Sequence, residues 1–305
     1  MEARPKKPLL GAIVLLVATV IWGLSYVAQS DGMRYLGPLT YSCVRILLGG
    51  VALVPVVWAF HRFDPRYRTG TKAELRSINR ISILGGIVVG AFMCGAATLQ
   101  QYGIAVTSAG KAGFLTALYI VLVPVFGVFF KRKITWLAAA SVLLALVGSY
   151  FLCVTGSLTI ELGDWLLIGD ALLFAFQILF IDFFMARGAD AVLLSCTEFL
   201  TAGLLLVVPM FLFEQPTWQS VWDAKYTILY AGLASGAVGY TLQVLGQREI
   251  EPTAASLLMS LESVFAVLFG WLLLGQALSV RELVGCALVF AAVILSQLPV
   301  GKRSA

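Results

Sequence analysis

Long apolar stretches, separated by short polar connectors, run along almost the whole chain. Each stretch is about 17–25 residues long, which suits a transmembrane helix, whereas the strands of a membrane barrel alternate over about ten residues. Backbone groups in hydrocarbon must be hydrogen-bonded within their own segment, so the pattern predicts an all-α polytopic membrane protein. The ten predicted spans are residues 10–28, 40–60, 80–102, 107–130, 134–154, 164–186, 191–213, 225–246, 253–274 and 281–298.

The connectors between these spans are mostly short and carry helix-breaking residues such as Gly37-Pro38. The longest connector, residues 62–80, is too polar to cross a membrane and begins with Asp64-Pro65. We therefore expect a surface loop there, with a short interfacial helix.

The second half of the chain repeats the first. Thr98-Leu99-Gln100 aligns with Thr241-Leu242-Gln243 and, with a slightly different offset, Ser42-Cys43-Val44-Arg45 aligns with Ser195-Cys196-Thr197-Glu198. The first alignment, continued without a gap, pairs Gly103 with Gly246, Leu118 with Leu261, Val121 with Val264 and Gly127 with Gly270. We predict two five-helix repeats, over residues 1–155 and 160–300. Because five is an odd number, the repeats have opposite orientations, as in carriers that open alternately to each side of a membrane.

The placement of Lys and Arg gives the orientation, because basic residues accumulate in cytoplasmic loops. With a cytoplasmic N-terminus, the outside loops hold only Arg34, Lys225 and Arg281. The inside segments then hold Arg4, Lys6, Lys7, Arg62, Arg66, Arg68, Lys72, Arg76, Arg80, Lys131, Arg132, Lys133, Arg187, Arg248, Lys302 and Arg303. This bias predicts a multi-pass protein of the cell (inner, cytoplasmic) membrane with both termini in the cytoplasm. It also supports the inversion, since the basic turn at residues 131–133 aligns with Gly275-Gln276, which has no base.

The composition agrees with a bilayer environment and excludes other classes. Apolar residues make up 60% of the 305 residues and charged residues only 12%, against about 25% in a soluble domain. The net charge of +5 then reflects topology and contact with anionic lipids rather than nucleic-acid binding. No cofactor or metal site is expected, because the cysteines lie within spans without a C-x-x-C pair and fit apolar packing better than zinc or disulfides. These cysteines are Cys43, Cys94, Cys153, Cys196 and Cys286.

Four ionisable residues within the spans are candidates for function, because such groups are costly in hydrocarbon and usually face a cavity or a partner. Arg45 and Lys111 lie near span ends, where their side chains are long enough to reach the outer headgroups. Glu198 lies deeper, and Glu262 is the deepest of the four. Glu262 suits proton coupling or a counter-charge for a cationic substrate; a structural hydrogen bond to a neighbouring helix is the alternative. Lys111 suits a headgroup anchor or a substrate contact equally.

Polar and aromatic residues form stripes at helical spacing on several spans. Such stripes suit the wall of a path for a moderately polar molecule, although close helix packing explains the small residues and an interfacial aromatic belt explains Trp22, Tyr26 and Tyr240. The stripes are Trp22, Ser25, Tyr26 and Gln29; Gly86, Gly90, Met93, Ala97 and Gln100 or Gln101; Asp170, Phe174 and Gln177; and Gly236, Tyr240, Gln243 and Gln247.

Several of these segments resemble a known family. The run from Leu99 to Pro124, the segment Gly239-Tyr-Thr-Leu-Gln243 and the segment from Ser260 to Ala266 are similar to the EamA-type carriers of the drug/metabolite transporter superfamily. Pro38 with Arg45 also fits the family pattern in the second helix. The resemblance implies ten helices and a central cavity lined by helices 1, 3, 4, 6, 8 and 9. It further implies export or exchange of amino acids, related metabolites or drugs without ATP, and it leaves Arg45 and Glu198 a structural or gating role.

We therefore expect a secondary transporter for small polar metabolites that works by alternating access. A cation and an anion within reach, Lys111 and Glu262, suit a zwitterion such as an amino acid. The alternative is an uncoupled uniporter for the same substrates. The expected substrate-binding or coupling residues are Glu262, Lys111, Trp22, Tyr26, Gln100, Gln177, Tyr240 and Gln243.

Other functional classes are disfavoured. An intramembrane enzyme lacks H-E-x-x-H and G-x-S-x-G motifs, which leaves only a Ser108–Lys111 pair by spacing. A channel lacks rings of like charge, and ATP-driven transport lacks a phosphate-binding loop. Small residues such as Gly148 and Gly285 on the fifth and tenth spans suit either a homodimer or packing within the monomer.

Overall fold

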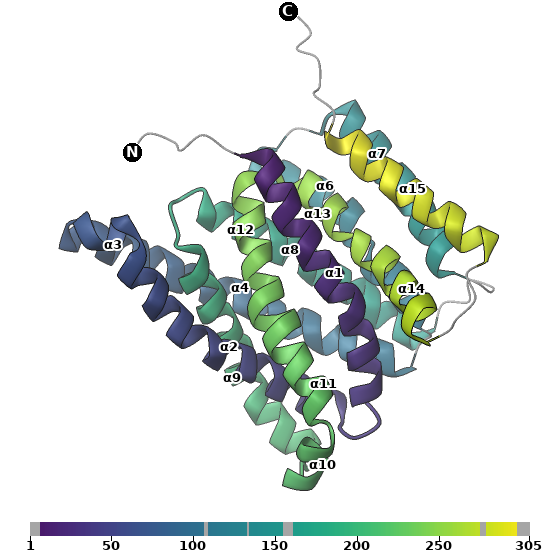
Figure 1. Cartoon of the computed structure of the whole chain (residues 1–305), viewed down its shortest axis with the longest axis horizontal. Helices are drawn as coiled ribbons and strands as arrows, with labels where there is room; N and C mark the ends of the chain where they lie inside the picture. The colour runs from purple at the N-terminus through teal and green to yellow at the C-terminus, as the bar shows by residue number, and fades with distance from the viewer. Residues whose placement is uncertain (1–6, 107–108, 133, 155–160, 275–278, 298–305) are drawn as a thin grey trace, which may run out of the picture.

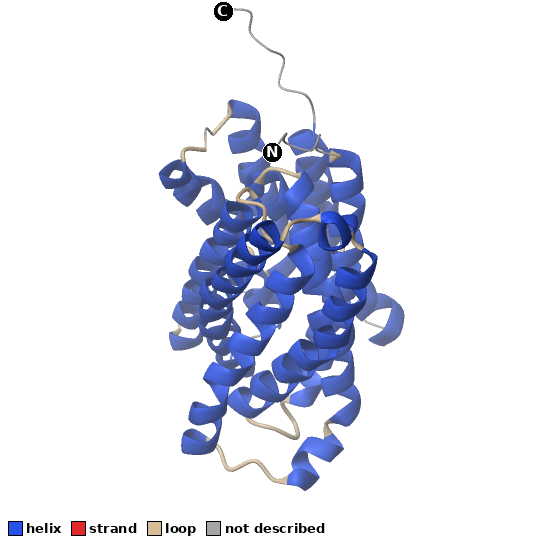
Figure 2. Ribbon diagram, turned by 90° about the vertical axis from the view of Figure 1, so that its left-hand side faces the viewer, coloured by secondary structure: helices blue, strands red, loops and turns tan. Residues whose placement is uncertain are grey.

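The computed structural model describes residues 7–106, 109–132, 134–154, 161–274 and 279–297, with side chains except at 109–111, 153, 270, 273–274 and 297. Every regular element in this part of the chain is helical (Figure 2). The first half contains α1 (Pro8–Gly32), α2 (Pro38–Phe63), α3 (Pro65–Thr69), α4 (Lys72–Val106), α5 (Ala109–Thr116), α6 (Tyr119–Gly127), η1 (Val128–Phe130) and α7 (Trp136–Cys153). The second half contains α8 (Leu162–Met185), α9 (Ala191–Phe213), α10 (Trp218–Asp223), α11 (Lys225–Leu229), η2 (Tyr230–Tyr240), α12 (Thr241–Glu249), α13 (Pro252–Met259), α14 (Leu261–Leu274) and α15 (Val280–Gln297).

The helices follow the ten predicted spans. Among the described residues, eight helical stretches are long and apolar enough to cross a membrane by length and composition, and α7 holds a shorter apolar helix. The remaining span, α15, packs along α7 at one edge of the bundle (Figure 1). The all-α, ten-helix prediction is confirmed.

The prediction of a long surface loop over residues 62–80 is wrong in part. Helix α3 is the expected short helix, but α4 begins at Lys72 and continues through the basic stretch into the span. The start of α4 is fixed by a reciprocal cap: Thr71 Oγ1 accepts a hydrogen bond from the Glu74 amide at 3.3 Å, and the Thr71 amide donates to Glu74 Oε2 at 2.9 Å.

Helix packing follows the inverted repeat. Helix α4 of the first half packs on α8, and its counterpart in the second half, η2 with α12, packs on α1. Likewise α1 packs on α14, while α8 packs on α5 and α6. The pairs α2 with α9, and α7 with α15, join equivalent helices of the two halves. Each repeat therefore buries its polar and small-residue faces against the other repeat.

Two glycines that the repeat alignment pairs permit equivalent close approaches. A Cβ at Gly103 would lie 2.5 Å from Leu167 Cγ, and one at Gly246 would lie 2.6 Å from Leu15 Cγ. Both distances are far below van der Waals contact, so α4 with α8, and α12 with α1, approach closely only because these residues lack a side chain.

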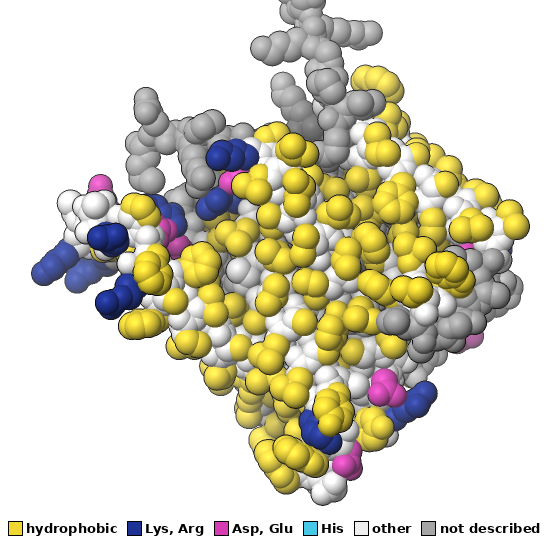
Figure 3. Space-filling model, viewed as in Figure 1, with side chains coloured by type: hydrophobic (Ala, Val, Ile, Leu, Met, Phe, Trp, Pro, Cys, Tyr) yellow, Lys and Arg dark blue, Asp and Glu magenta, His cyan; other side chains and the backbone are white. Residues whose placement is uncertain are grey.

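The surface agrees with a membrane setting. One face is largely covered by hydrophobic side chains, with charged side chains confined to its edges (Figure 3). One end of the bundle carries Lys7, Arg66, Arg132 and Arg248, and we call it the basic end. There the Lys7 amide donates to Glu249 Oε2 at 2.8 Å, and Arg66 pairs with Asp190 at 3.0 Å. Both contacts join the two halves of the chain.

At the opposite end, a carboxylate caps a helix of the other repeat. Glu214, which follows α9, accepts hydrogen bonds from the backbone amides of Leu39 and Thr40 at 3.0 and 2.8 Å. These amides begin α2 and have no partner within their own helix. The two halves are thus joined at both ends of the bundle.

The two glycines considered for a dimer interface are used within the chain. A Cβ at Gly148 would lie 2.8 Å from the Val289 backbone nitrogen, and one at Gly285 would lie 2.6 Å from that of Leu152. These glycines pack α7 against α15, so the homodimer stays a prediction and requires another surface.

Candidate functional site

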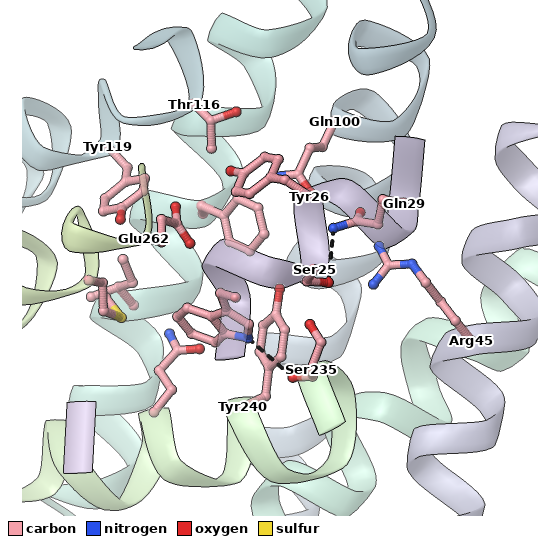
Figure 4. Close-up of a pocket in the computed structure, with 15 residues that line it drawn as sticks. Ser25, Tyr26, Gln29, Arg45, Gln100, Thr116, Tyr119, Ser235, Tyr240 and Glu262 are labelled. Atoms are coloured by element: carbon pink, nitrogen blue, oxygen red, sulfur yellow. Dashed lines mark hydrogen bonds between the residues drawn. The ribbon is translucent and has the colours of Figure 1, made fainter. Parts of the chain in front are cut away.

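A cavity lies at the centre of the bundle, between the two repeats (Figure 4). Its volume is about 50 Å³, room for a few water molecules and below the range typical of small-molecule sites, so the cavity is narrow in this conformation. Its wall combines hydroxyl, amide, aromatic and charged side chains from spans 1, 2, 3, 4, 6, 8 and 9. The lining residues are Trp22, Ser25, Tyr26, Gln29, Arg45, Gln100, Thr116, Tyr119, Phe174, Ile178, Ser235, Tyr240, Gln243, Met259 and Glu262.

Interrupted helices bring some of these side chains to the cavity. The fourth span breaks between α5 and α6, next to Thr116 and Tyr119, and the ninth breaks between α13 and α14, next to Met259 and Glu262. The repeat alignment pairs Thr116 with Met259 and Tyr119 with Glu262. Broken helices at the interface of inverted repeats are a common way to build a substrate site in transporters.

A widened helical segment supplies another part of the wall. Residues Tyr230–Tyr240 form a π-helix, a conformation that is rare and often found at functional sites. Within it, the Ser235 carbonyl accepts a hydrogen bond from Trp22 Nε1 at 3.1 Å. The rings of Trp22 and Tyr240 contact each other with centroids 5.0 Å apart. The predicted aromatic residues thus lie inside the bundle rather than in an interfacial belt.

Two carboxyl groups lie at or near the cavity. Glu262 lies near the phenol groups of Tyr26 and Tyr119, as Figure 4 shows. Asp170 lies behind the wall and is fully buried; it accepts hydrogen bonds from Thr116 at 2.9 Å and from Gln100 Nε2 at 3.5 Å. Glu262 has no basic partner in the described part of the chain.

Arg45 supplies the cation of the cavity. Its side chain is buried, with a relative exposure of 3%, and lines the cavity instead of extending to the headgroups. The physical reason is that α2 packs against both α9 and η2; a Cβ at Gly232 in η2 would lie 2.8 Å from the Arg45 carbonyl. Among the described residues, no carboxylate pairs with Arg45, and its Nε atom has no hydrogen-bond partner.

A second layer of polar residues lies behind the wall. Gln243 lines the cavity and donates through Nε2 to Gln177 Oε1 at 3.0 Å. Gln177 in turn donates through Nε2 to Glu198 Oε1 at 2.8 Å. Gln177 and Glu198 are fully buried and do not line the cavity.

The structure therefore places most of the predicted site residues around one cavity. Gln177 lies behind the wall rather than in it, and the side chain of Lys111 and the residue Ser108 lie outside the described residues. Ser25, Gln29 and Phe174 also line the cavity and belong to the predicted polar stripes. The lining residues outside those stripes are Arg45, Thr116, Tyr119, Ile178, Ser235 and Met259, of which the repeat alignment pairs Tyr119 with Glu262.

Known proteins share this sequence and architecture. An uncharacterised transporter of Archaeoglobus fulgidus is 27% identical over 98% of this chain and 89% of its own length. The uncharacterised transporter YoaV of Bacillus subtilis is 23% identical over 97% of this chain and 99% of its own. The WAT1-related protein At3g02690 of Arabidopsis thaliana is 25% identical over 95% and 70%, respectively.

The fold and the family model extend this similarity to the whole chain. A solved crystal structure matches with a TM-score of 0.76 at 15% identity, covering 94% of this chain and 96% of the other. The model of the EamA-like transporter family matches residues 9–154 and again residues 161–298. The chain therefore belongs to the EamA-like transporter family and is a multi-pass membrane transporter.

Proposed function

We propose that this transporter is a secondary carrier of small polar metabolites, such as amino acids or related amines and drugs, and that it exports or exchanges them by alternating access. The observation that carries the proposal is a central cavity lined by both repeats, with Glu262 in its wall and with Arg45, which pairs with no carboxylate among the described residues. A zwitterion supplies a partner for each charge.

The energetics favour a ligand with a carboxylate. A buried guanidinium group loses its hydration and costs several kcal/mol unless an anion or several acceptors replace the water. Arg45 is buried without such an anion in the described chain, so a substrate carboxylate gains a strong, charge-assisted partner there. The Glu262 carboxylate, flanked by Tyr26 and Tyr119, suits a substrate ammonium group.

The inverted repeat supports the transport mechanism. Two halves of similar structure can exchange conformations around a site between them, which gives states open to either side. We propose that the basic end faces the cytoplasm of the cell membrane, because the described Lys and Arg residues gather there.

Uptake of radiolabelled amino acids, amines and small drugs into proteoliposomes tests the proposal. We expect saturable uptake of at least one zwitterion, which Arg45→Gln reduces at least tenfold and Arg45→Lys reduces less, because Lys keeps the charge. Absence of saturable flux for every compound refutes the proposal, and equal flux by wild type and Arg45→Gln refutes the role of Arg45.

The same assay separates ion coupling from uniport. If Glu262 exchanges protons with the substrate, an imposed pH gradient drives uptake by the wild type but not by Glu262→Gln. Uptake that is independent of the gradient in both proteins instead identifies an uncoupled uniporter.

A further inference from the structure

Three buried side chains form a hydrogen-bonded relay that ends at the cavity. Glu198 on α9 and Gln177 on α8 have no exposed surface, and Gln243 on α12 is 2% exposed. The two bonds of the relay, 2.8 Å from Gln177 to Glu198 and 3.0 Å from Gln243 to Gln177, both have an amide nitrogen as donor. The relay thus connects a residue on the seventh span to the wall of the cavity without passing through water.

The carboxyl group sets the direction of this relay. A carboxylate oxygen only accepts hydrogen bonds, and the same holds for Glu198 Oε1 if a proton resides on Oε2. Gln177 must therefore turn its amide nitrogen toward Glu198, which leaves its oxygen for Gln243. Gln243 must then turn its own nitrogen toward Gln177. The remaining atom, Gln243 Oε1, is buried and has no partner among the described residues.

The repeat-related glutamine on the other side has a similar orientation. Gln100, which the repeat alignment pairs with Gln243, also lines the cavity. Its Nε2 donates to Asp170 Oδ2, over a longer distance of 3.5 Å. In each repeat, therefore, the lining glutamine donates its amide nitrogen to the polar layer behind the wall: Gln100 donates to the acid Asp170 directly, and Gln243 is linked to the acid Glu198 through Gln177.

We propose that Glu198 is a positioning residue that acts through Gln177 to make the Gln243 side of the cavity a hydrogen-bond acceptor. This wall then selects substrates that present an N–H or O–H donor. The inference rests on the proposed carrier function and adds a specificity element to it. Glu198 itself does not contact the substrate.

Substitution of Glu198 by Gln allows the hydrogen bonds of the relay to run in either direction. The new amide can donate to Gln177, which reverses both bonds and turns the nitrogen of Gln243 toward the cavity. The reversed direction is favoured because it leaves the free amide hydrogens on Gln243, where water or a ligand in the cavity can accept them. In the original direction the free amide hydrogens belong to the new amide at position 198 and stay unpaired in the core. Moving the acid to the other end, in the double variant Glu198→Gln/Gln243→Glu, restores an acceptor at the wall.

Counterflow in proteoliposomes with two probes tests the proposal. The probes are L-alanine, which has N–H donors, and N,N,N-trimethyl-L-alanine, which keeps both charges but has none. In Glu198→Gln we expect the half-saturation concentration for L-alanine to rise about fivefold to tenfold relative to that for the trimethyl probe, the loss of one hydrogen bond. In the double variant this ratio returns to within about threefold of the wild type. Equal changes for both probes, or no recovery in a double variant that is monodisperse and thermally as stable as the wild type, overturn the proposal.

A measurement without substrate separates this inference from the carrier function. In the wild-type protein in micelles, the proposal predicts nuclear Overhauser contacts from the Gln177 amide hydrogens to the γ-methylene of Glu198. In Glu198→Gln, it predicts that these contacts move to the γ-methylene of Gln243. Contacts to Gln243 in the wild type overturn the relay even if transport is observed. Contacts from Gln177 to Glu198 in the wild type support the relay even if neither probe is carried. In that case only the proposal of a zwitterionic substrate is refuted.

Discussion

Removal of Arg132 is expected to open the basic end of the transporter. Arg132 follows the fourth span and pairs with Asp182 at the end of α8, and its Nη1 atom donates to Glu251 Oε2 at 2.8 Å, before α13. Both partners belong to the second repeat, so this one side chain ties three segments across the interface between the halves. A state open at the basic end must break or lengthen these contacts.

The exposure of the partners sets the size of the effect. The side chains of Arg132, Asp182 and Glu251 are 34%, 12% and 60% exposed. The pair with the exposed Glu251 contributes about 0.5 kcal/mol, and the better-buried, charge-assisted bond to Asp182 contributes about 1.5 kcal/mol. Loss of both, about 2 kcal/mol, shifts the equilibrium toward the open state by roughly 30-fold.

The assay is the rate at which an impermeant methanethiosulfonate reagent, applied at the basic end, modifies Ser25→Cys in the cavity of a protein without its native cysteines. Arg132→Ala should raise this rate by roughly 10-fold to 30-fold. The matched control is Arg248→Ala, because Arg248 pairs at 3.0 Å with Glu249 in its own helix and does not cross the interface. An unchanged rate in Arg132→Ala, or an equal increase in Arg248→Ala, refutes the reasoning.

Three further outcomes follow from contacts outside the cavity. Glu214→Ala removes the acceptor for two amides of α2 and should lower the free energy of unfolding in detergent by about 1–2 kcal/mol, whereas Glu214→Gln should lose less. Gly285→Val places a side chain where a Cβ already lies 2.6 Å from α7, so the melting temperature should fall, whereas Gly127→Ala, with its nearest neighbour at 3.6 Å, should be tolerated. Hydrogen bonds from Arg66 hold the pKa of Asp64 below its usual value of 3.8. The Asp64–Arg66 pair therefore stabilises α3 fully above pH 3.8, and this stabilisation is lost as the pH falls through the lower pKa that Asp64 has in the folded protein. An NMR titration of the wild type, with Asp64→Asn as the control, can measure this pKa and the accompanying loss of α3.

The apolar pattern was sufficient to predict the spans, but not the irregularities within them. The seventh span coincides with α9, since Asp190 caps its first turn and Pro209 does not end it. The break between α5 and α6 falls at Ala117-Leu118, which contains neither Gly nor Pro, so the local sequence did not signal it. The π-helix over Tyr230–Tyr240 was not predicted either. The cap formed by Thr71 and Glu74 was readable as a Thr-x-x-Glu motif and was missed.

The site was predictable where a polar residue lies on a helix face that meets the cavity, as for Tyr26 and Gln243. Helical periodicity does not distinguish the cavity wall from the layer behind it, which is why Gln177 was assigned to the wall. For Arg45, side-chain length allowed contact with the headgroups, but packing by η2 and α9 excludes it. Tyr119 was accessible to reasoning, because the repeat aligns it with the best candidate, Glu262.

Counterflow is the most direct test of the central claim that one cavity faces the two sides of the membrane in turn. Proteoliposomes loaded with an unlabelled zwitterion that the protein carries are diluted into a trace of the same compound in labelled form. Alternating access predicts a transient accumulation of label above its external concentration, which is absent without the internal load and strongly reduced in Arg45→Gln. Label that only rises to equality, at a rate indifferent to the internal load, would contradict the account.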